Sequence, residues 1–374
     1  MSYFINCSIN TVLIFINYIL KKRNNSYLEK LKRFLIGIKA EVIYVIEDEG
    51  WAIEWVGKYI TRNLKKLNLI KAEITKPQIF KKKIIHYGSI NCLVYNNTLI
   101  QKHRSNKIVL TWFHISPKDD RVKLIPIINK YVDIVHTSSK ITARKLKQYG
   151  FDDEKIIVIP LGVDNSHFKM HDKDDKEKLR EKYKIPKNKI IIGSFQKDGV
   201  GWGEGLEPKL IKGPDILCKV LKKLSDEFDI HVFLTGPARG YIKNKLKEFN
   251  IPFTHIFLEN YLDIVECYNL LDLYLVTSRA EGGPQALLEA MATGVPIVTT
   301  NVGMAPNLIK DNSNGLIAEV ENTEEIFQYS KTILTDADLR QHLIKNGQKT
   351  IKNYSWEYIA KEYFSKIYLK FRDR

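Results

Sequence analysis

Cysteine is scarce in this sequence, and the pattern of its histidines lacks the usual metal motifs. The 374 residues include four cysteines, which lie far apart with no C-x-x-C pair: Cys7, Cys92, Cys218 and Cys267. This excludes a disulfide scaffold and a zinc knuckle, and it is typical of a protein from a reducing cytoplasm. The nine histidines form no H-E-x-x-H and no cluster with Asp or Glu at metal-ligand spacing. We therefore expect no protein-held metal.

A long uninterrupted apolar run is also missing. Residues 3–20 are apolar but contain three asparagines and a serine, and they stop at the basic run 21–23. A spanning helix needs about 20 mostly apolar residues, so this segment is borderline and polar for a membrane span. A second stretch, residues 28–38, has leucines and an isoleucine at helical spacing beside Lys30, Lys32 and Arg33. We interpret residues 1–40 as an extension that lies on a membrane surface; a helix pair packed on the protein body is the open alternative.

Negative charge is scarce in the first third of the chain. Residues 1–110 hold 19 Lys and Arg against 7 Asp and Glu, so they carry most of the net charge of +16. A one-sided surplus attracts a polyanion, either nucleic acid or an anionic membrane leaflet. The sequence lacks a helix-turn-helix, an aromatic platform and a finger motif, which disfavours nucleic acid as the partner. The compositional bias of an AT-rich genome is the open alternative to any anionic partner.

What the chain does contain is a series of short β-branched runs that alternate with helical patterns. Such alternation is typical of parallel α/β sheets with crossover helices, and no repeat of fixed period is present. The length fits two domains, which we place at residues 41–170 and 187–355. Residues 169–189 are rich in Lys and Asp and read as a solvated connector, and residues 356–374 form a final helix. In two successive doubly wound domains, ligands bind at the carboxyl ends of the strands.

The stretch EGGPQALLEAMATGVP, residues 281–296, is the most informative one. It follows a strand and starts a helix at Pro284, while Gly294 supplies a left-handed stop. Gly282 and Gly283 leave backbone N–H groups and the positive end of the helix dipole open to an anion such as a diphosphate. Glu289, in the second turn, is suited to accept hydrogen bonds from the paired hydroxyls of a ribose.

Glu281 stands just before this helix, where it can meet the polar group beyond the phosphates. The alternative for the whole motif is that Gly-Gly-Pro only shapes a turn and that Glu289 is a solvated helix residue.

This block resembles the signature of the retaining nucleotide-sugar glycosyltransferases of family 4, which have two glutamates separated by seven residues. Other segments occur in the family's order: VDIVHTSSKITARKLKQYG, KIIVIPLGVDNSHF, Lys212-Gly213, LTGP around Gly236, and NVGMAPNLI after the main motif. The resemblance covers residues 105–370 well and 41–104 loosely. It implies a GT-B fold, in which two Rossmann-like domains face each other and the C-terminal helix crosses back to the first domain.

The resemblance also implies roles for individual residues. Glu289 is similar to the ribose-binding glutamate, Gly282 and Gly283 to the backbone seat for phosphate and sugar, and Glu281 to the glutamate near the donor sugar. Lys212 matches the lysine that neutralises the diphosphate.

His114, at the end of the predicted strand KIVLTWFH, matches a histidine that reaches the sugar; a packed structural histidine is the alternative. The predicted donor-binding set is Lys197, Gly236, Gly282, Gly283, Pro284 and Glu289, and the predicted catalytic set is His114, Lys212 and Glu281.

The chain departs from the family pattern in several places. Gln196 and Lys197 stand where the family has an arginine, so Lys197 is our candidate for the second phosphate cation. Glu49-Gly50-Trp51 replaces a Gly-Gly loop on the acceptor side. An insertion at residues 198–208 precedes Lys212 and has the composition of a mobile flap.

The function implied is transfer of a sugar, with retention, from a nucleotide-diphosphate sugar to a hydroxyl of a glycan or lipid-linked acceptor. No cofactor or metal is expected, and the location implied is the cytoplasm, with a peripheral position at the membrane. A GT-B epimerase of sugar nucleotides, or a phosphorylase, shares the two-domain crevice and is the alternative activity.

Overall fold

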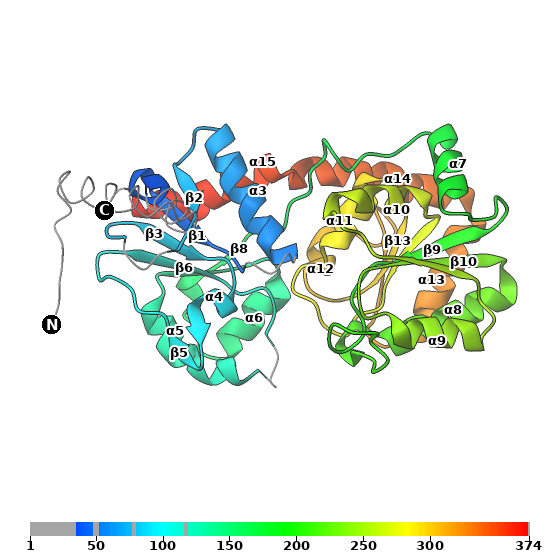
Figure 1. Cartoon of the computed structure of the whole chain (residues 1–374), viewed down its shortest axis with the longest axis horizontal. Coiled ribbons are helices and arrows are strands. Elements are labelled where there is room, and N and C mark those ends of the chain that lie inside the picture. Colours follow the sequence, from blue (N-terminus) through cyan, green and yellow to red (C-terminus); the bar gives the residue numbers. More distant parts are fainter. Residues whose placement is uncertain (1–34, 48–51, 77–79, 116–118, 373–374) are drawn as a thin grey trace, which may run out of the picture.

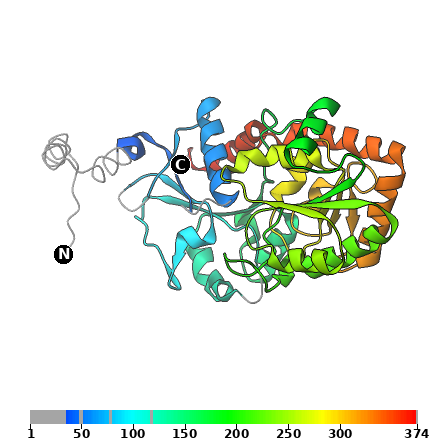
Figure 2. The same cartoon turned by 45° about the vertical axis from the view of Figure 1, so that its right-hand side comes forward.

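The computed structural model describes residues 35–47, 52–76, 80–115 and 119–372. They form two α/β domains, each with a six-stranded parallel sheet, that follow one another along the long axis of the molecule (Figures 1 and 2). The two-domain, doubly wound architecture predicted from the sequence is therefore confirmed. Most of the predicted membrane-surface extension, residues 1–34, and the Glu49-Gly50-Trp51 loop lie outside the described residues.

The first sheet has the order β2-β1-β3-β6-β7-β8. Its strands are parallel, and the four inner strands are nearly all buried, as expected when helices cover both faces, whereas the edge strands β2 and β8 are mostly half-buried. Figure 1 shows α3 and α15 on one side of this sheet and α5 and α6 on the other. The elements are β1 (Val42–Val45), α3 (Ala52–Lys66), β2 (Ala72–Ile74), β3 (Ile84–Tyr87), α4 (Ile90–Leu93), the hairpin strands β4 (Val94–Tyr95) and β5 (Thr98–Leu99), β6 (Lys107–Thr111), α5 (Ile125–Tyr131), β7 (Ile134–Thr137), α6 (Lys140–Gln148) and β8 (Ile156–Val158).

The second sheet has the order β11-β10-β9-β12-β13-β14. The chain runs outward from β9 and then resumes with β12 on the other side of β9, so the strand order reverses between these two strands. Its elements are β9 (Ile190–Ser194), α8 (Pro214–Glu227), β10 (Ile230–Thr235), α9 (Gly240–Glu248), β11 (Phe253–Ile256), α10 (Ile264–Leu270), β12 (Leu273–Val276), α11 (Gln285–Ala292), β13 (Ile297–Thr300), α12 (Ala305–Leu308), β14 (Leu316–Ala318), α13 (Thr323–Thr335) and α14 (Ala337–Thr350).

The connector between the domains is not simply solvated, contrary to the prediction. It contains helix α7 (Lys173–Lys182), which begins at the N-cap Asp172. Arg180 in this helix is buried and donates to Asp272 Oδ2 at 3.3 Å and to the carbonyl of Lys189 at 3.1 Å. The charged composition of the connector predicted an exposed segment. The guanidinium of Arg180 is buried all the same, because it has hydrogen-bond partners inside the second domain.

The C-terminal segment returns to the first domain. Helix α15 (Trp356–Tyr363) packs along α3, where Trp356 stacks on Tyr59 with ring centroids 5.2 Å apart. After it the chain continues as a π-helical turn, in which the hydroxyl of Tyr368 lies 2.7 Å from Nδ1 of the buried His86. Burial lowers the pKa of His86, so this histidine is a neutral structural residue that fastens the C-terminus.

Candidate active site

The candidate site lies where the order of the second sheet reverses. The loop after β9 carries Gln196 and Lys197, and the loop after β12 leads to the Glu281 motif. Because β9 and β12 are neighbours and parallel, their carboxyl ends meet at the same edge of the sheet.

Lys212 is held at this edge by the glycine that follows it. Gly213 has φ +63°, and a Cβ atom there would lie 1.9 Å from the carbonyl oxygen of Thr277. Only glycine therefore fits this approach to the end of β12. Thr277 Oγ1 also donates to the Gly213 carbonyl at 2.9 Å. The Lys-Gly pair seen in the sequence thus fixes the position of the Lys212 backbone.

Lys212 and Glu281 form a direct ion pair. Lys212 Nζ donates to both carboxylate oxygens of Glu281, at 2.6 and 2.7 Å. The side chains of Lys212 and Glu281 are 24% and 12% exposed, so the pair is only partly reached by water. Ser278 Oγ donates to the same carboxylate at 2.8 Å, and Gln196 Nε2 donates to the Lys212 carbonyl at 2.7 Å.

The loop that carries Glu281 is fixed by residues that the sequence prediction missed. Arg279 makes two parallel hydrogen bonds to Asp215, each 2.8 Å long, and a third to Glu321 at 2.6 Å. Such a bidentate pair fixes the orientation of the two side chains as well as attracting them to each other. The available signal was the position of Arg279 directly after a strand and of Asp215 in the first turn after Lys212-Gly213.

Gly282 and Gly283 lie against the first domain. A Cβ on Gly282 would lie 2.4 Å from the carbonyl oxygen of Phe113, and one on Gly283 would lie 2.7 Å from Ser138 Oγ. Pro284 is the N-cap of α11 rather than its first residue, and Gln285 begins the helix. The left-handed stop predicted at Gly294 is confirmed by its φ of +72°.

Glu289 is buried, with 2% of its surface exposed. Tyr268 donates to its Oε2 at 2.9 Å, and the hydroxyl of Tyr261 binds its Oε1. Burial raises the pKa of Glu289 to about 7, and the two hydroxyls oppose that rise. The alternative of a solvated helix residue is therefore wrong, and both tyrosines were missed from the sequence.

His114 faces the Lys212–Glu281 pair from the first domain. Strand β6 ends at Thr111, so His114 lies in the loop after the strand and not at its end as predicted. Part of its surface is exposed, while the surrounding residues remove some of its hydration. Loss of hydration and the charge of Lys212 lower the pKa of His114, while Glu281 opposes that shift, so the imidazole is neutral at pH 7.

Lys197 and a third lysine, Lys209, add positive charge to this edge. The ammonium of Lys197 lies 3.9 Å from the ring centroid of Trp202 in the insertion. Desolvation and the charges of Lys212 and Lys197 lower the pKa of Lys209, so the three lysines lie within electrostatic reach of one another. Lys209 was missed because it directly follows the insertion at residues 198–208, which has no counterpart in the family pattern.

The predicted flap, residues 198–208, is fixed to the second domain by its backbone. Gly240 N–H donates to the Glu204 carbonyl at 2.6 Å, and Tyr241 N–H donates to that of Gly205 at 2.9 Å. Gly236, with φ +82°, lies after β10, and a Cβ atom there would meet no heavy atom within 4 Å. Its carbonyl accepts a hydrogen bond from His255 at 2.7 Å.

The structure thus brings His114, Lys212 and Glu281 together with Lys209, and it places Gly282 and Gly283 beside them. Glu289 lies further along, in the second turn of α11. Lys209 and Lys212 lie near the Glu281 carboxylate, and Lys197 lies near Lys209. With the N-terminus of a helix beside them, they form a region of positive potential that is suited to a phosphorylated ligand.

Comparisons with known proteins agree with this chemistry. Residues 175–350 match the family described as Glycosyl transferases group 1. The second domain is homologous to group 1 glycosyltransferases. Two similar proteins are an uncharacterized glycosyltransferase of Methanocaldococcus jannaschii, 29% identical over 39% of this chain and 41% of its own, and the N-acetyl-alpha-D-glucosaminyl L-malate synthase of Bacillus anthracis, 26% identical over 54% and 51%. The chain therefore spans about half or less of the length of these relatives.

Solved structures extend the likeness in fold to both domains. Anabaena HepE, in complex with UDP and glucose, has a TM-score of 0.71 and 17% identity, covering 88% of this chain and 100% of that one. Sucrose-phosphate synthase from Thermosynechococcus elongatus has a TM-score of 0.62 and 16% identity over 88% and 81%. The predicted GT-B fold is confirmed.

Metal-ligand clusters and membrane-spanning helices are both missing from the described residues. Within the part of the chain that the structure describes, no three His, Cys, Asp or Glu side chains lie close enough to hold a metal ion. Among the same residues, none of the helices has the length and apolar character needed to cross a bilayer.

Proposed function

We propose that this protein transfers a sugar from a nucleoside diphosphate sugar to a hydroxyl of a glycan or lipid-linked acceptor, with retention at the anomeric carbon. The observation that carries the proposal is Lys212, fixed by Gly213 and paired with Glu281 at the reversal point of a domain that matches the group 1 glycosyltransferase family. This domain would bind the donor, and the first domain would bind the acceptor.

The reaction needs stabilisation of the leaving diphosphate as its bond to the sugar carbon breaks. Lys212 is a cation fixed at this site, and the N-terminus of α11, which begins just after Gly283 and Pro284, supplies backbone dipoles of the same sign. Preorganised charges of this kind contribute most where negative charge develops. With the donor bound, Lys212 would exchange the Glu281 carboxylate for a phosphate oxygen.

Glu281 and His114 would then be available to form hydrogen bonds with the donor sugar. A carboxylate accepts hydrogen bonds from sugar hydroxyls, and a neutral imidazole can donate one and accept one. Neither residue is required as a covalent nucleophile in the proposed front-face reaction, in which the departing phosphate takes the proton of the acceptor hydroxyl. The pairing of Glu281 with Lys212 supports this role, because it holds the carboxylate beside the cation proposed for the diphosphate.

The donor class can be tested by release of nucleoside diphosphate. UDP-sugars should be assayed first, because HepE was crystallised with UDP and UDP-glucose. The proposal predicts release of nucleoside diphosphate only when a glycan or lipid-linked acceptor is added, and a fall in turnover of roughly 10²-fold for Lys212→Ala. Lys222→Ala, which removes an exposed lysine paired with Asp226 on α8, is the matched control and should behave as wild type.

The same assay separates the alternative activities. Conversion of the sugar nucleotide without any acceptor would indicate an epimerase. Formation of a sugar phosphate from a glycan and inorganic phosphate, without nucleotide, would indicate a phosphorylase. Wild-type turnover of Lys212→Ala at saturating donor would remove Lys212 from the reaction.

Attachment to an anionic membrane from the cytoplasmic side is the second part of the proposal. It rests on the basic surplus of residues 1–110 and on the apolar run 3–20. The full chain should sediment with anionic vesicles at low salt, and a chain that starts at Glu41 should sediment less. Equal recovery of both in the supernatant would leave genome composition as the explanation of the basic surplus.

A further inference from the structure

The carboxylate of Glu289 has no free access for a ligand in this structure. One oxygen accepts from Tyr268 and the other from Tyr261, and only 2% of the residue is exposed. A carboxylate has about four acceptor positions, but those that remain on Glu289 do not face solvent. A ribose that binds Glu289 must therefore displace one of the two tyrosine hydroxyls.

Tyr261 is the tyrosine that can move. Tyr268 lies inside helix α10, is fully buried, and packs on Phe195 and Tyr274 with centroid distances of 4.8 and 5.3 Å. Tyr261 instead begins a short 3₁₀ turn, Tyr261–Asp263, and is only partly buried. Moving it disturbs one turn and the ring contacts described next, whereas moving Tyr268 would disrupt the core of the domain.

The Tyr261 ring also contacts the first domain. Its centroid lies 5.7 Å from that of Trp55 in α3 and 6.5 Å from that of Phe168 in the segment that links the domains. A single side chain thus contacts the Glu289 carboxylate on the donor side and an aromatic residue on the acceptor side. Any displacement of Tyr261 changes the environment of Trp55.

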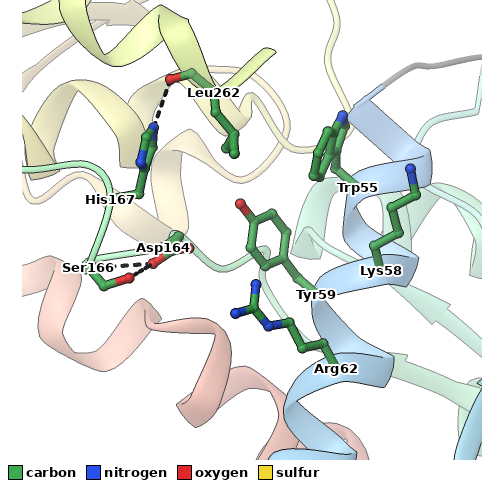
Figure 3. A pocket seen from close by; sticks show the side chains of 8 residues that line it. All are labelled: Trp55, Lys58, Tyr59, Arg62, Asp164, Ser166, His167 and Leu262. Atoms are coloured by element: carbon green, nitrogen blue, oxygen red, sulfur yellow. Dashed lines mark hydrogen bonds between the residues drawn. The ribbon is translucent and has the colours of Figure 1, made fainter. Parts of the chain in front are cut away.

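Space for such a displacement lies next to this contact. A pocket of about 250 Å³ opens between α3, the linker and Leu262 (Figure 3). Tyr261 does not line this pocket, but Trp55, which its ring contacts, and its chain neighbour Leu262 both do. In Figure 3, His167 and Leu262 face Trp55 and Tyr59 across the pocket, and His167 is fixed by its 2.7 Å contact with the Leu262 carbonyl.

We propose that Tyr261 is an internal substitute for the donor's ribose. In the free protein its hydroxyl occupies the hydrogen-bonding position on Glu289, and a bound nucleotide displaces it toward the pocket beside Trp55. Donor binding is thereby coupled to the contact between the two domains. This inference rests on the proposed function, since it takes the ligand of Glu289 to be a nucleoside diphosphate.

The test is nucleotide affinity, measured by calorimetry with UDP, GDP and ADP on the wild-type chain and on three variants. Tyr261→Phe keeps the ring but removes the competing hydroxyl, so it should bind the preferred nucleotide more tightly, by roughly 2- to 10-fold. Tyr268→Phe is the matched control, because it removes the other hydroxyl that binds the Glu289 carboxylate. This variant should not tighten nucleotide binding. Glu289→Gln should weaken binding.

Tryptophan emission gives a second readout. Nucleotide should change the emission of the wild-type chain, and Trp55→Phe should lose the part of that change that does not come from Trp202 beside Lys197. If Tyr261→Phe binds nucleotide no more tightly than the wild type while Glu289→Gln binds it more weakly, the Tyr261 hydroxyl does not compete with the ribose. The proposed donor site would still stand. No binding of any nucleotide to the wild type, or no effect of Glu289→Gln, would contradict the proposed function itself.

Discussion

Lys212 Nζ donates hydrogen bonds to both oxygens of Glu281, at 2.6 and 2.7 Å, so the cation proposed for the diphosphate is already neutralised by a carboxylate. Glu281 therefore competes with the ligand for Lys212. Charged hydrogen bonds of this kind are strong when water is partly excluded. Any phosphate that enters must replace the carboxylate, and this exchange has measurable consequences.

Glu281→Gln should raise the affinity for the nucleoside diphosphate and lower the turnover of the nucleotide sugar. Removal of the competing charge leaves Lys212 available, so the free nucleoside diphosphate, which has no sugar, should bind roughly 3- to 10-fold more tightly. Turnover of the nucleotide sugar should fall, because the carboxylate proposed to contact the sugar is lost. Calorimetry and a kinetic assay on the same preparation check both effects. Weaker binding of the diphosphate would show that Glu281 does not compete for Lys212.

Glu289 should make stability and nucleotide affinity depend on pH in opposite directions. Burial raises the pKa of Glu289 from 4.5 to about 7, so between these values the native state binds a proton that the unfolded chain does not. Stability should therefore fall as pH rises from about 5 to 8, by about 3 kcal/mol at most relative to Glu289→Gln. Nucleotide affinity should rise over the same range, since the ionised carboxylate is the better acceptor. Parallel pH profiles for the wild type and Glu289→Gln would contradict this assignment.

Gly282→Ala tests the close approach of the two domains. The added Cβ would lie 2.4 Å from the Phe113 carbonyl oxygen of the first domain, so the Glu281 loop or the domain contact must shift. We expect a loss of roughly 1–3 kcal/mol in stability and a larger fall in turnover. Gly203→Ala is the control, because no heavy atom lies within 4 Å of its Cβ position. Wild-type turnover in Gly282→Ala would mean that the loop tolerates the shift.

Asp198, which follows Lys197 in the chain, forms a buried ion pair with Arg239. Arg239 Nε lies 3.0 Å from Asp198 Oδ1, and both side chains are 0% exposed. Asp198→Ala leaves Arg239 as an uncompensated buried charge, so chemical denaturation should show a loss of about 3–5 kcal/mol. Asp226→Ala removes an exposed partner of Lys222 on the same domain and should change stability by less than about 1 kcal/mol.

The sequence predicted the elements whose pattern is local. The alternation of β-branched runs with helical patterns predicted the parallel sheets of both domains, because buried parallel strands and amphipathic helices carry their own periodicity. Helix α7 was missed, since its charged composition concealed the burial of Arg180.

The candidate site was predicted only in part. Lys212, Glu281 and Glu289 belong to a contiguous motif or a fixed-order segment, and the structure places Lys212 and Glu281 in contact. Tyr261 and Tyr268 were not predicted, because their contacts with Glu289 span 28 and 21 residues and depend on how α10 packs. Such tertiary contacts leave no periodic signal in a single sequence.

The most direct test of the donor site is a thermal-shift titration with UDP-, GDP- and ADP-sugars. A ligand that binds only the folded state raises the melting temperature by an amount that increases with its affinity. The wild-type chain should be stabilised by the sugars of one base, and Lys212→Ala and Glu289→Gln should show a smaller shift with the same ligand. If no nucleotide sugar stabilises the wild type, or if all three chains shift equally, then Lys212 and Glu289 do not form a donor site.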